Sequence, residues 1–150
     1  MNTEFSVFQE FKKVICLVFK EIKLQEKNND EILSRYFVTN APYTTIFGET
    51  AASSFLIVDE YRKIRIEACI LSTDNDNDED FPYMLLNGIY AYPEKEIIFV
   101  VDGGGYKPGA RKWLEKNIKD NWLDFKKTGK DIKLMTIVEF INWFNHEFKK

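Results

Sequence analysis

The chain has 150 residues, of which 45% are hydrophobic, and it contains 13 Phe, 7 Tyr and 3 Trp. This content of apolar and aromatic side chains excludes an intrinsically disordered protein and predicts a single folded domain over residues 1–150. No apolar run reaches the about 18 residues that a membrane-spanning helix needs, and the apolar segment 14–19 is flanked by charged side chains. We therefore expect a cytoplasmic protein with no membrane partner.

Charge is distributed unevenly along the chain. The formal net charge is -3, but residues 1–102 carry 10 basic and 18 acidic side chains, whereas residues 103–150 carry 11 basic and 6 acidic ones. The balance is therefore -8 in the first part and +5 in the second. A basic end can mark a surface that faces phosphate groups, although lysines that keep helix surfaces in water explain it more simply.

The first part of the chain predicts a helix followed by strands. Apolar side chains recur at helical spacing from residue 3 to residue 27, which indicates one amphipathic helix. After a polar break, short runs rich in β-branched and aromatic residues predict strands at 36–38, 43–47, 55–58 and 64–71. We expect these strands to form an antiparallel meander.

The second part predicts alternating helices and strands. A helix at 83–92 is closed by Pro93, an apolar strand at 96–101 runs into Asp102, and Pro108 begins a helix that reaches about residue 125. A strand at 132–135 follows, and Thr136 with Glu139 forms a capping box before the last helix. The order αβββαβαβα predicts an α/β fold with a mixed sheet flanked by helices.

The hairpin around the polar turn 59–63 carries the main candidate site. Glu67 and Cys69 share one face of its second strand because side chains alternate along a strand. A turn centred in the middle of 59–63 places Glu67 opposite Phe55 and close to Ser54. Phosphodiester cleavage gathers carboxylates around Mg²⁺ and often adds a lysine beside the attacking water. Ser54 therefore stands where a second carboxylate is expected.

Three sequence elements follow one another along the chain. They are Arg65-Ile66-Glu67-Ala68-Cys69-Ile70-Leu71, then Asp78-Glu79-Asp80-Phe81-Pro82-Tyr83, then Asp102-Gly103-Gly104-Gly105-Tyr106-Lys107. On these elements the chain resembles the PD-(D/E)xK, or restriction-endonuclease-like, superfamily, in particular a bacterial group of small nuclease-like domains. The resemblance implies a restriction-endonuclease-like core of order αβββαβ with added C-terminal α/β elements.

The same resemblance implies that the catalytic residues are incomplete. Cys69 takes the place of the catalytic lysine and Ser54 takes that of the first metal carboxylate, so only Glu67 matches. A neutral thiol cannot hold positive charge beside a phosphate group, and a hydroxyl is a poor ligand for Mg²⁺. We therefore predict an inactive nuclease fold without a cofactor, which acts by binding DNA, a protein partner or a second copy of the chain. The resemblance also suggests a role in bacterial defence or phage counter-defence.

Three alternatives stay open. One is an active Mg²⁺-dependent DNA endonuclease that uses Glu67 with Asp59, about four residues or ~13 Å along the hairpin, or with Glu21 of the first helix. Another is a homo-oligomeric scaffold with no nucleic-acid role. The third is a structural role for Glu67 as the ion-pair partner of Arg65 or of a lysine from the basic part of the chain.

The glycine turn after residue 102 is a second candidate site. The backbone N–H groups of Gly104 and Gly105 precede a helix, and Lys107 and Arg111 lie near them in the sequence. Such a turn can hold a phosphate group, although tight-turn geometry is the better explanation of the glycines.

Several other signals predict structure rather than chemistry. Asp74, Asp76 and Asp78 imitate the start of a calcium-binding loop without its glycine and its final glutamate, so we expect a solvated loop. Cys16 and Cys69 have no metal-binding spacing and are expected to be buried thiols. We expect no catalytic triad at His146, and we expect core positions for the aromatic residues of the last helix, which are Phe140, Trp143, Phe144 and Phe148.

Overall fold

The computed structural model describes residues 3–21, 25–26, 35–60, 62–70 and 80–148. Its helices are α1 (Thr3–Glu21), α2 (Phe81–Tyr90), α3 (Pro108–Lys119) and α4 (Ile137–Phe148), with a 3-10 segment at Trp122–Thr128. Its strands are β1 (Gln25–Glu26), β2 (Arg35–Thr44), β3 (Thr50–Asp59), β4 (Arg62–Ile70), β5 (Glu96–Asp102) and β6 (Asp131–Met135). The acidic residues 74, 76 and 78 lie outside the described residues.

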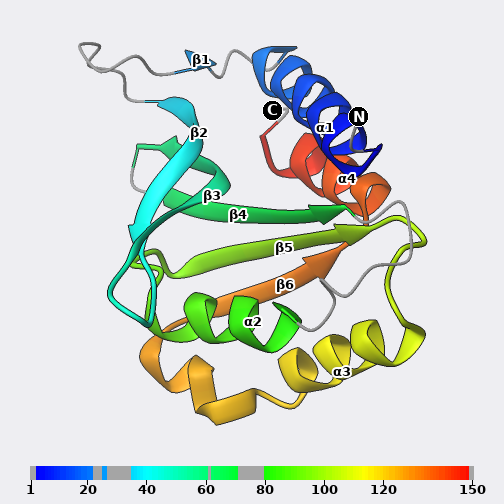
Figure 1. Cartoon of the computed structure of the whole chain (residues 1–150). Helices are drawn as coiled ribbons and strands as arrows, with labels where there is room; N and C mark the ends of the chain where they lie inside the picture. Colours follow the sequence, from blue (N-terminus) through cyan, green and yellow to red (C-terminus); the bar gives the residue numbers. More distant parts are fainter. Residues whose placement is uncertain (1–2, 22–24, 27–34, 61, 71–79, 149–150) are drawn as a thin grey trace.

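The strands form one mixed sheet between two layers of helices. The strand order is β1-β2-β3-β4-β5-β6, in which β2, β3 and β4 are antiparallel neighbours and β4, β5 and β6 run parallel. Helices α1 and α4 cover one face of the sheet, and α2 and α3 cover the other (Figure 1). The predicted α/β class, the meander and the order of the longer elements are confirmed, with the short β1 added.

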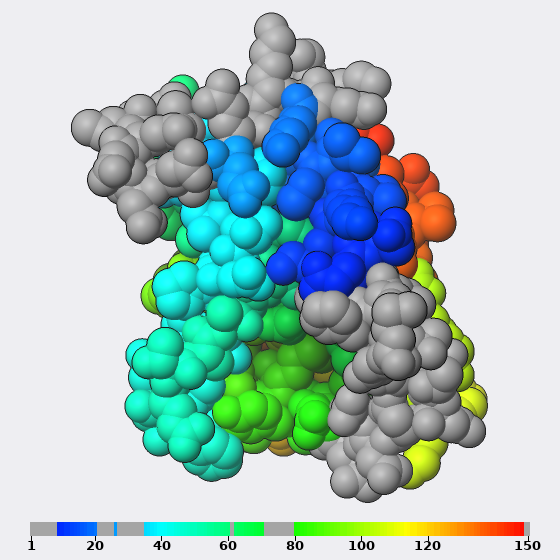
Figure 2. All heavy atoms as spheres, turned by 45° about the horizontal axis from the view of Figure 1, so that its top comes forward, coloured from blue at the N-terminus to red at the C-terminus, as the bar shows by residue number. Residues whose placement is uncertain are grey.

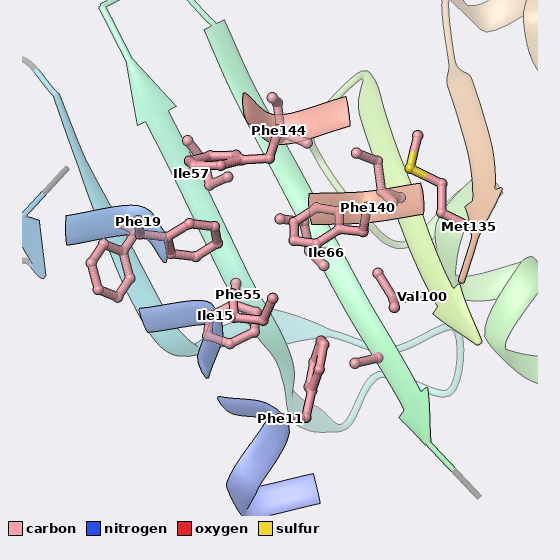
Figure 3. Close-up of a cluster of buried hydrophobic side chains, with 14 of the residues drawn as sticks. Phe11, Ile15, Phe19, Phe55, Ile57, Ile66, Val100, Met135, Phe140 and Phe144 are labelled. Atoms are coloured by element: carbon pink, nitrogen blue, oxygen red, sulfur yellow. The ribbon is translucent and has the colours of Figure 1, made fainter. Parts of the chain in front are cut away.

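Each face of the sheet carries its own hydrophobic core. Side chains alternate along β5, so Ile98 and Val100 face α1 and α4 while Ile97, Phe99 and Val101 face α2 and α3. On the first face, the ring of Phe19 lies edge-on to those of Phe37 and Phe55, at centroid distances of 4.9 and 5.4 Å (Figure 3). The predicted core positions of Phe140, Phe144 and Phe148 are confirmed, and Trp143 packs half-buried beside them.

On the second face, α2 lies close to the sheet. A methyl group at position 88 would lie 2.9 Å from Cζ of Phe99, so glycine is the residue that lets the helix approach β5. Asn87 is also buried in this helix, and its Oδ1 accepts a hydrogen bond of 3.0 Å from the N–H of Ile46. These two contacts fix α2 against the sheet and against the turn between β2 and β3.

Several predicted boundaries are wrong. The first helix ends at Glu21 rather than near residue 27, and residues 25 and 26 pair with β2 as a strand. The run 36–38 and the first two residues of the run 43–47 belong to one strand, β2, which passes through Pro42, whereas residues 45–47 lie between β2 and β3. In the described part of the sheet, β1 reaches only Tyr36 and Phe37, so Pro42 lies on an open edge where a missing N–H breaks no ladder. Helix α2 begins and ends two residues earlier than expected.

The helix that begins at Pro108 is shorter than predicted. It ends at Lys119, and Asn121, Leu123 and Asp124 take left-handed conformations with φ of 57°, 58° and 54°. The side chain of Asn121 stabilises this turn, since its Oδ1 accepts from the N–H of Lys126 at 2.9 Å and its Nδ2 donates to Asp124 at 2.9 Å. The capping box at the start of α4 is confirmed by reciprocal bonds between Thr136 and Glu139, of 3.0 and 3.2 Å.

Candidate functional site

Glu67 and Ser54 face each other across the β3–β4 hairpin. Phe55 pairs with Ile66, so the register is one residue lower than expected and Ser54, not Phe55, is level with Glu67. The Ser54 hydroxyl donates a hydrogen bond of 3.1 Å to Oε1 of Glu67 and accepts one of 3.0 Å from the N–H of Ala68. The structure therefore brings together the two residues that the sequence placed side by side.

A second hydroxyl completes the surroundings of the Glu67 carboxyl. The hydroxyl of Tyr92, which follows α2, donates to Oε2 of Glu67 at 3.4 Å. Burial of the carboxyl raises the pKa of Glu67 to about 7, although the hydrogen bonds from Ser54 and Tyr92 and the charge of Arg65 act in the opposite direction. At neutral pH the carboxyl is therefore divided between its neutral and charged forms.

Glu67 lies in a cavity of about 300 Å³ between the sheet and α2. Cys69 lies on the same face of β4, and the rings of Tyr43, Tyr83 and Tyr92 line the cavity together with Asp80. The space-filling view shows the hollow in this region, with α2 (green) beside the β2–β3 turn (Figure 2). The cavity is thus open to solvent and carries carboxyl, thiol and phenol groups.

Arg65 does not form an ion pair with Glu67. Its guanidinium is buried and pairs with the buried carboxylate of Glu94, with Nε donating to Oε1 and Nη2 donating to Oε2 at 3.3 Å. It also donates to the carbonyl of Ala41 at 3.0 Å and to the hydroxyl of Ser53 at 2.9 Å. The predicted alternative of an Arg65–Glu67 pair is therefore wrong, because Glu94 and the β2 backbone hold the guanidinium.

A lysine from the basic part of the chain supports the same region without contacting Glu67. Lys130 is buried and its Nζ donates to the carbonyl oxygens of Tyr92 and Glu94, the second at 2.9 Å. Burial lowers the pKa of Lys130, and the positive charge of Lys95 adds to that effect. The guanidinium carbon of Arg65 lies 5.6 and 5.3 Å from the ring centroids of Tyr43 and Tyr92. Arg65, through these rings, and Lys130, through the Tyr92 carbonyl, therefore stabilise the part of the cavity that the tyrosines line.

Asp59, one of the other two predicted metal ligands, is not brought to Glu67. Asp59 lies five residues from Ser54 along β3, which is about 16 Å at roughly 3.3 Å per residue, and it pairs with Arg35 at 3.8 Å. Glu21 is the last residue of α1, and this helix covers the face of the sheet opposite to Glu67. The side chain of Glu21 is not among those that the structure describes. Within the described ranges, no three His, Cys, Asp or Glu side chains are grouped so that they could hold a metal ion.

The glycine turn after β5 is arranged around Asp102 and Arg111. The Asp102 carboxylate accepts from the N–H of Gly103 at 2.7 Å and from the N–H of Ile137 at 2.8 Å, so it joins the turn to the start of α4. Arg111 donates to the carbonyl of Val101 at 2.5 Å and to Glu115 at 3.0 Å. These hydrogen bonds account for the conformation of the glycine turn.

The four residues of the predicted phosphate site differ in their exposure. Gly104 and Lys107 are exposed, Gly105 is buried and Arg111 is half-buried. The carboxylate of Asp102, which accepts from the N–H of Gly103, places negative charge at this turn, and that charge disfavours the binding of an anion there. Phosphate binding at Gly104, Gly105, Lys107 and Arg111 stays a prediction.

The sequence did not single out Tyr43, Tyr92 or Glu94. Each is far from Glu67 along the chain, and no motif marks it. Tyr43 of β2 and Tyr92, which follows α2, come together edge-to-face at 4.7 Å only in the folded structure. Cys16 and Cys69 are free thiols, as predicted, but they are half-buried rather than buried.

A family model described as a PD-(D/E)XK nuclease superfamily domain matches residues 5–148. No curated protein and no solved structure matches the chain. The match and the mixed sheet with helices on both faces confirm the restriction-endonuclease-like fold. Across the described residues, no helix is long and apolar enough to cross a membrane.

Proposed function

The chain belongs to the PD-(D/E)XK nuclease superfamily, and on that premise we propose that it is a catalytically inactive nuclease domain that acts by binding DNA or a protein partner. The proposal takes residues 1–150 as a single domain. The observation that carries it is the contact between Glu67 and Ser54, in which a hydroxyl occupies the position expected for a second carboxylate.

The chemistry of the pair disfavours a Mg²⁺ site. Mg²⁺ prefers charged oxygen ligands in near-octahedral geometry, and a neutral hydroxyl that already bonds Glu67 and Ala68 is a poor replacement for one. Glu67 itself is partly protonated at neutral pH, because burial raises its pKa to about 7. Cys69 supplies no positive charge beside the site.

Calorimetric titration with Mg²⁺ and Mn²⁺ tests the proposal. We expect no heat of binding for the wild-type protein and for Glu67→Ala, and binding in a Ser54→Asp, Cys69→Lys double variant that restores the family's residues. Incubation of all three proteins with linear and supercoiled DNA in Mg²⁺ gives the matching measure of cleavage.

Binding by the wild-type protein that disappears in Glu67→Ala, together with Mg²⁺-dependent cleavage of DNA, would contradict the proposal and support an active endonuclease. Such a result would require a second ligand other than Asp59, which the fold keeps about 16 Å away. The proposed inactivity leaves partner binding as the function, and a role in bacterial defence or phage counter-defence is the context we propose for it.

A further inference from the structure

The cavity around Glu67 has the chemistry of a receptor for a cation. From its lining we infer that it takes the basic side chain, Arg or Lys, of a protein partner, with Glu67 as the counter-charge. This inference rests on the proposed binding function and names its partner class.

The charged side chains that line the cavity favour a cation over a phosphate group. Among the described residues, Glu67 and Asp80 are the carboxyls that line it, and none of its lining residues is Lys, Arg or His. Arg65 lies near the rings of Tyr43 and Tyr92, but its charge is matched by Glu94. A phosphate group would therefore meet two acidic side chains, whereas an ammonium or guanidinium group would be attracted by them.

The aromatic walls suit the same group. Tyr43 and Tyr92 meet at an interplanar angle of 89°, so they form two perpendicular sides of the cavity. Tyr83 adds a third ring, on which Phe47 of the β2–β3 turn stacks at 5.4 Å and 18°. Cations bind over the faces of aromatic rings, and Arg in particular combines ring stacking with hydrogen bonds to a carboxylate.

The size of the cavity and its rim indicate a protein partner rather than a free small molecule. A volume of about 300 Å³ is at the lower end of the roughly 300–1,000 Å³ of ligand sites, so it has room for one inserted side chain. Beside it, Phe47 is 72% exposed and Ile46 is 37% exposed. Exposed apolar side chains next to a pocket are typical of a protein contact surface, because a partner that inserts one side chain also covers the rim.

Protonation of Glu67 gives the interaction a characteristic pH dependence. The groups around the carboxyl are the hydroxyls of Ser54 and Tyr92, the phenol of Tyr43, the paired Arg65 and the carboxyl of Asp80. The pKa of Glu67 is raised to about 7 by burial, so the charged form increases as pH rises through neutrality. A ligand that requires the charged form therefore binds about tenfold more tightly at pH 8 than at pH 6.

A nuclear magnetic resonance titration of the full chain tests the inference with N-acetyl-arginine methylamide as the probe and with dCMP and inorganic phosphate as comparison ligands. We expect the arginine probe to shift the backbone amide signals of Ala68, Cys69 and Met84, with affinity that rises about tenfold from pH 6 to pH 8. In Glu67→Gln we expect at least about tenfold weaker binding and no pH dependence. The matched control is Glu60→Gln, at an exposed carboxylate of the β3–β4 turn, and it should bind as the wild type does.

Two outcomes overturn the inference. Shifts of the same amides by dCMP and not by the arginine probe would assign the cavity to nucleic acid. Absence of shifts with every ligand, while the spectrum of the wild-type protein shows a folded chain, would exclude a cation site. The proposed inactivity fails separately, since it is contradicted only by Mg²⁺ binding and cleavage of DNA, whichever probe occupies the cavity.

Discussion

Glu67 should make the stability of the protein depend on pH in a way that one substitution removes. Burial raises its pKa to about 7 in the folded state, from a value of 4.5 in the absence of such burial. The folded protein therefore binds this proton more tightly than the unfolded chain. The stabilisation from the protonated carboxyl is complete below pH 4.5 and is lost as pH rises through 7.

The size of the effect follows from the two pKa values. One unit of pKa difference corresponds to about 1.4 kcal/mol, so the two values predict a loss of about 2.5 kcal/mol between pH 5 and pH 8. Glu67→Gln keeps the shape of the neutral carboxyl and an oxygen that can accept from Ser54, but it cannot ionise. The free energy of unfolding of Glu67→Gln minus that of the wild type should therefore increase by about 2.5 kcal/mol over this range.

Urea denaturation at pH 5, 6, 7 and 8, followed by far-ultraviolet circular dichroism, measures this difference for both proteins. Taking the difference removes the contribution of the other titrating groups, since they are common to both. A difference that stays constant from pH 5 to pH 8 would show that the Glu67 carboxyl is not buried as described, and a difference that falls would show that its charged form is the stabilised one.

Three further substitutions test the surroundings of the site, each by urea denaturation. Arg65→Met should lower the free energy of unfolding by about 3–5 kcal/mol, because it leaves the buried Glu94 carboxylate unpaired. Arg62→Met is the control at a half-exposed ion pair and should lower it by about 1 kcal/mol or less. Equal losses in the two variants would contradict the buried Arg65–Glu94 pair. Ser54→Ala should lower the free energy of unfolding by about 1–2 kcal/mol, because the N–H of Ala68 loses its acceptor. A titration followed by nuclear magnetic resonance should also show a higher pKa for Glu67 in this variant, because the hydrogen bond from Ser54 is lost. An unchanged pKa would contradict the Ser54–Glu67 bond. Gly88→Ala should cost about 1–3 kcal/mol through its clash with Phe99, and a neutral effect would show that α2 does not approach β5 so closely.

Local patterns predicted most of the fold. The alternation of apolar residues, the glycine turn and the capping box at Thr136 and Glu139 depend on neighbours within a few residues, and the structure confirms the order of the longer elements. The boundaries of helices and strands were less predictable, because they depend on which residues the ends of each element contact. Helix α3 ends at Lys119 since Asn121 bonds Asp124 and Lys126. Strand β2 continues through Pro42 since that part of the strand lies at an edge that is open in the described part of the sheet.

The candidate site divides in the same way. A hairpin fixes which residues lie opposite each other once the turn is placed, so the sequence by itself determined that Ser54 and Glu67 are neighbours and that a hydroxyl, not a carboxylate, lies beside Glu67 on the adjacent strand. Only the tertiary structure decided that Arg65 pairs with Glu94, that Tyr43 and Tyr92 enclose the Glu67 carboxyl, and that its pKa is raised to about 7. These contacts join residues from β2, β4 and the segment after α2, and burial in a packed interior depends on how distant elements meet rather than on the order of residues in any one of them.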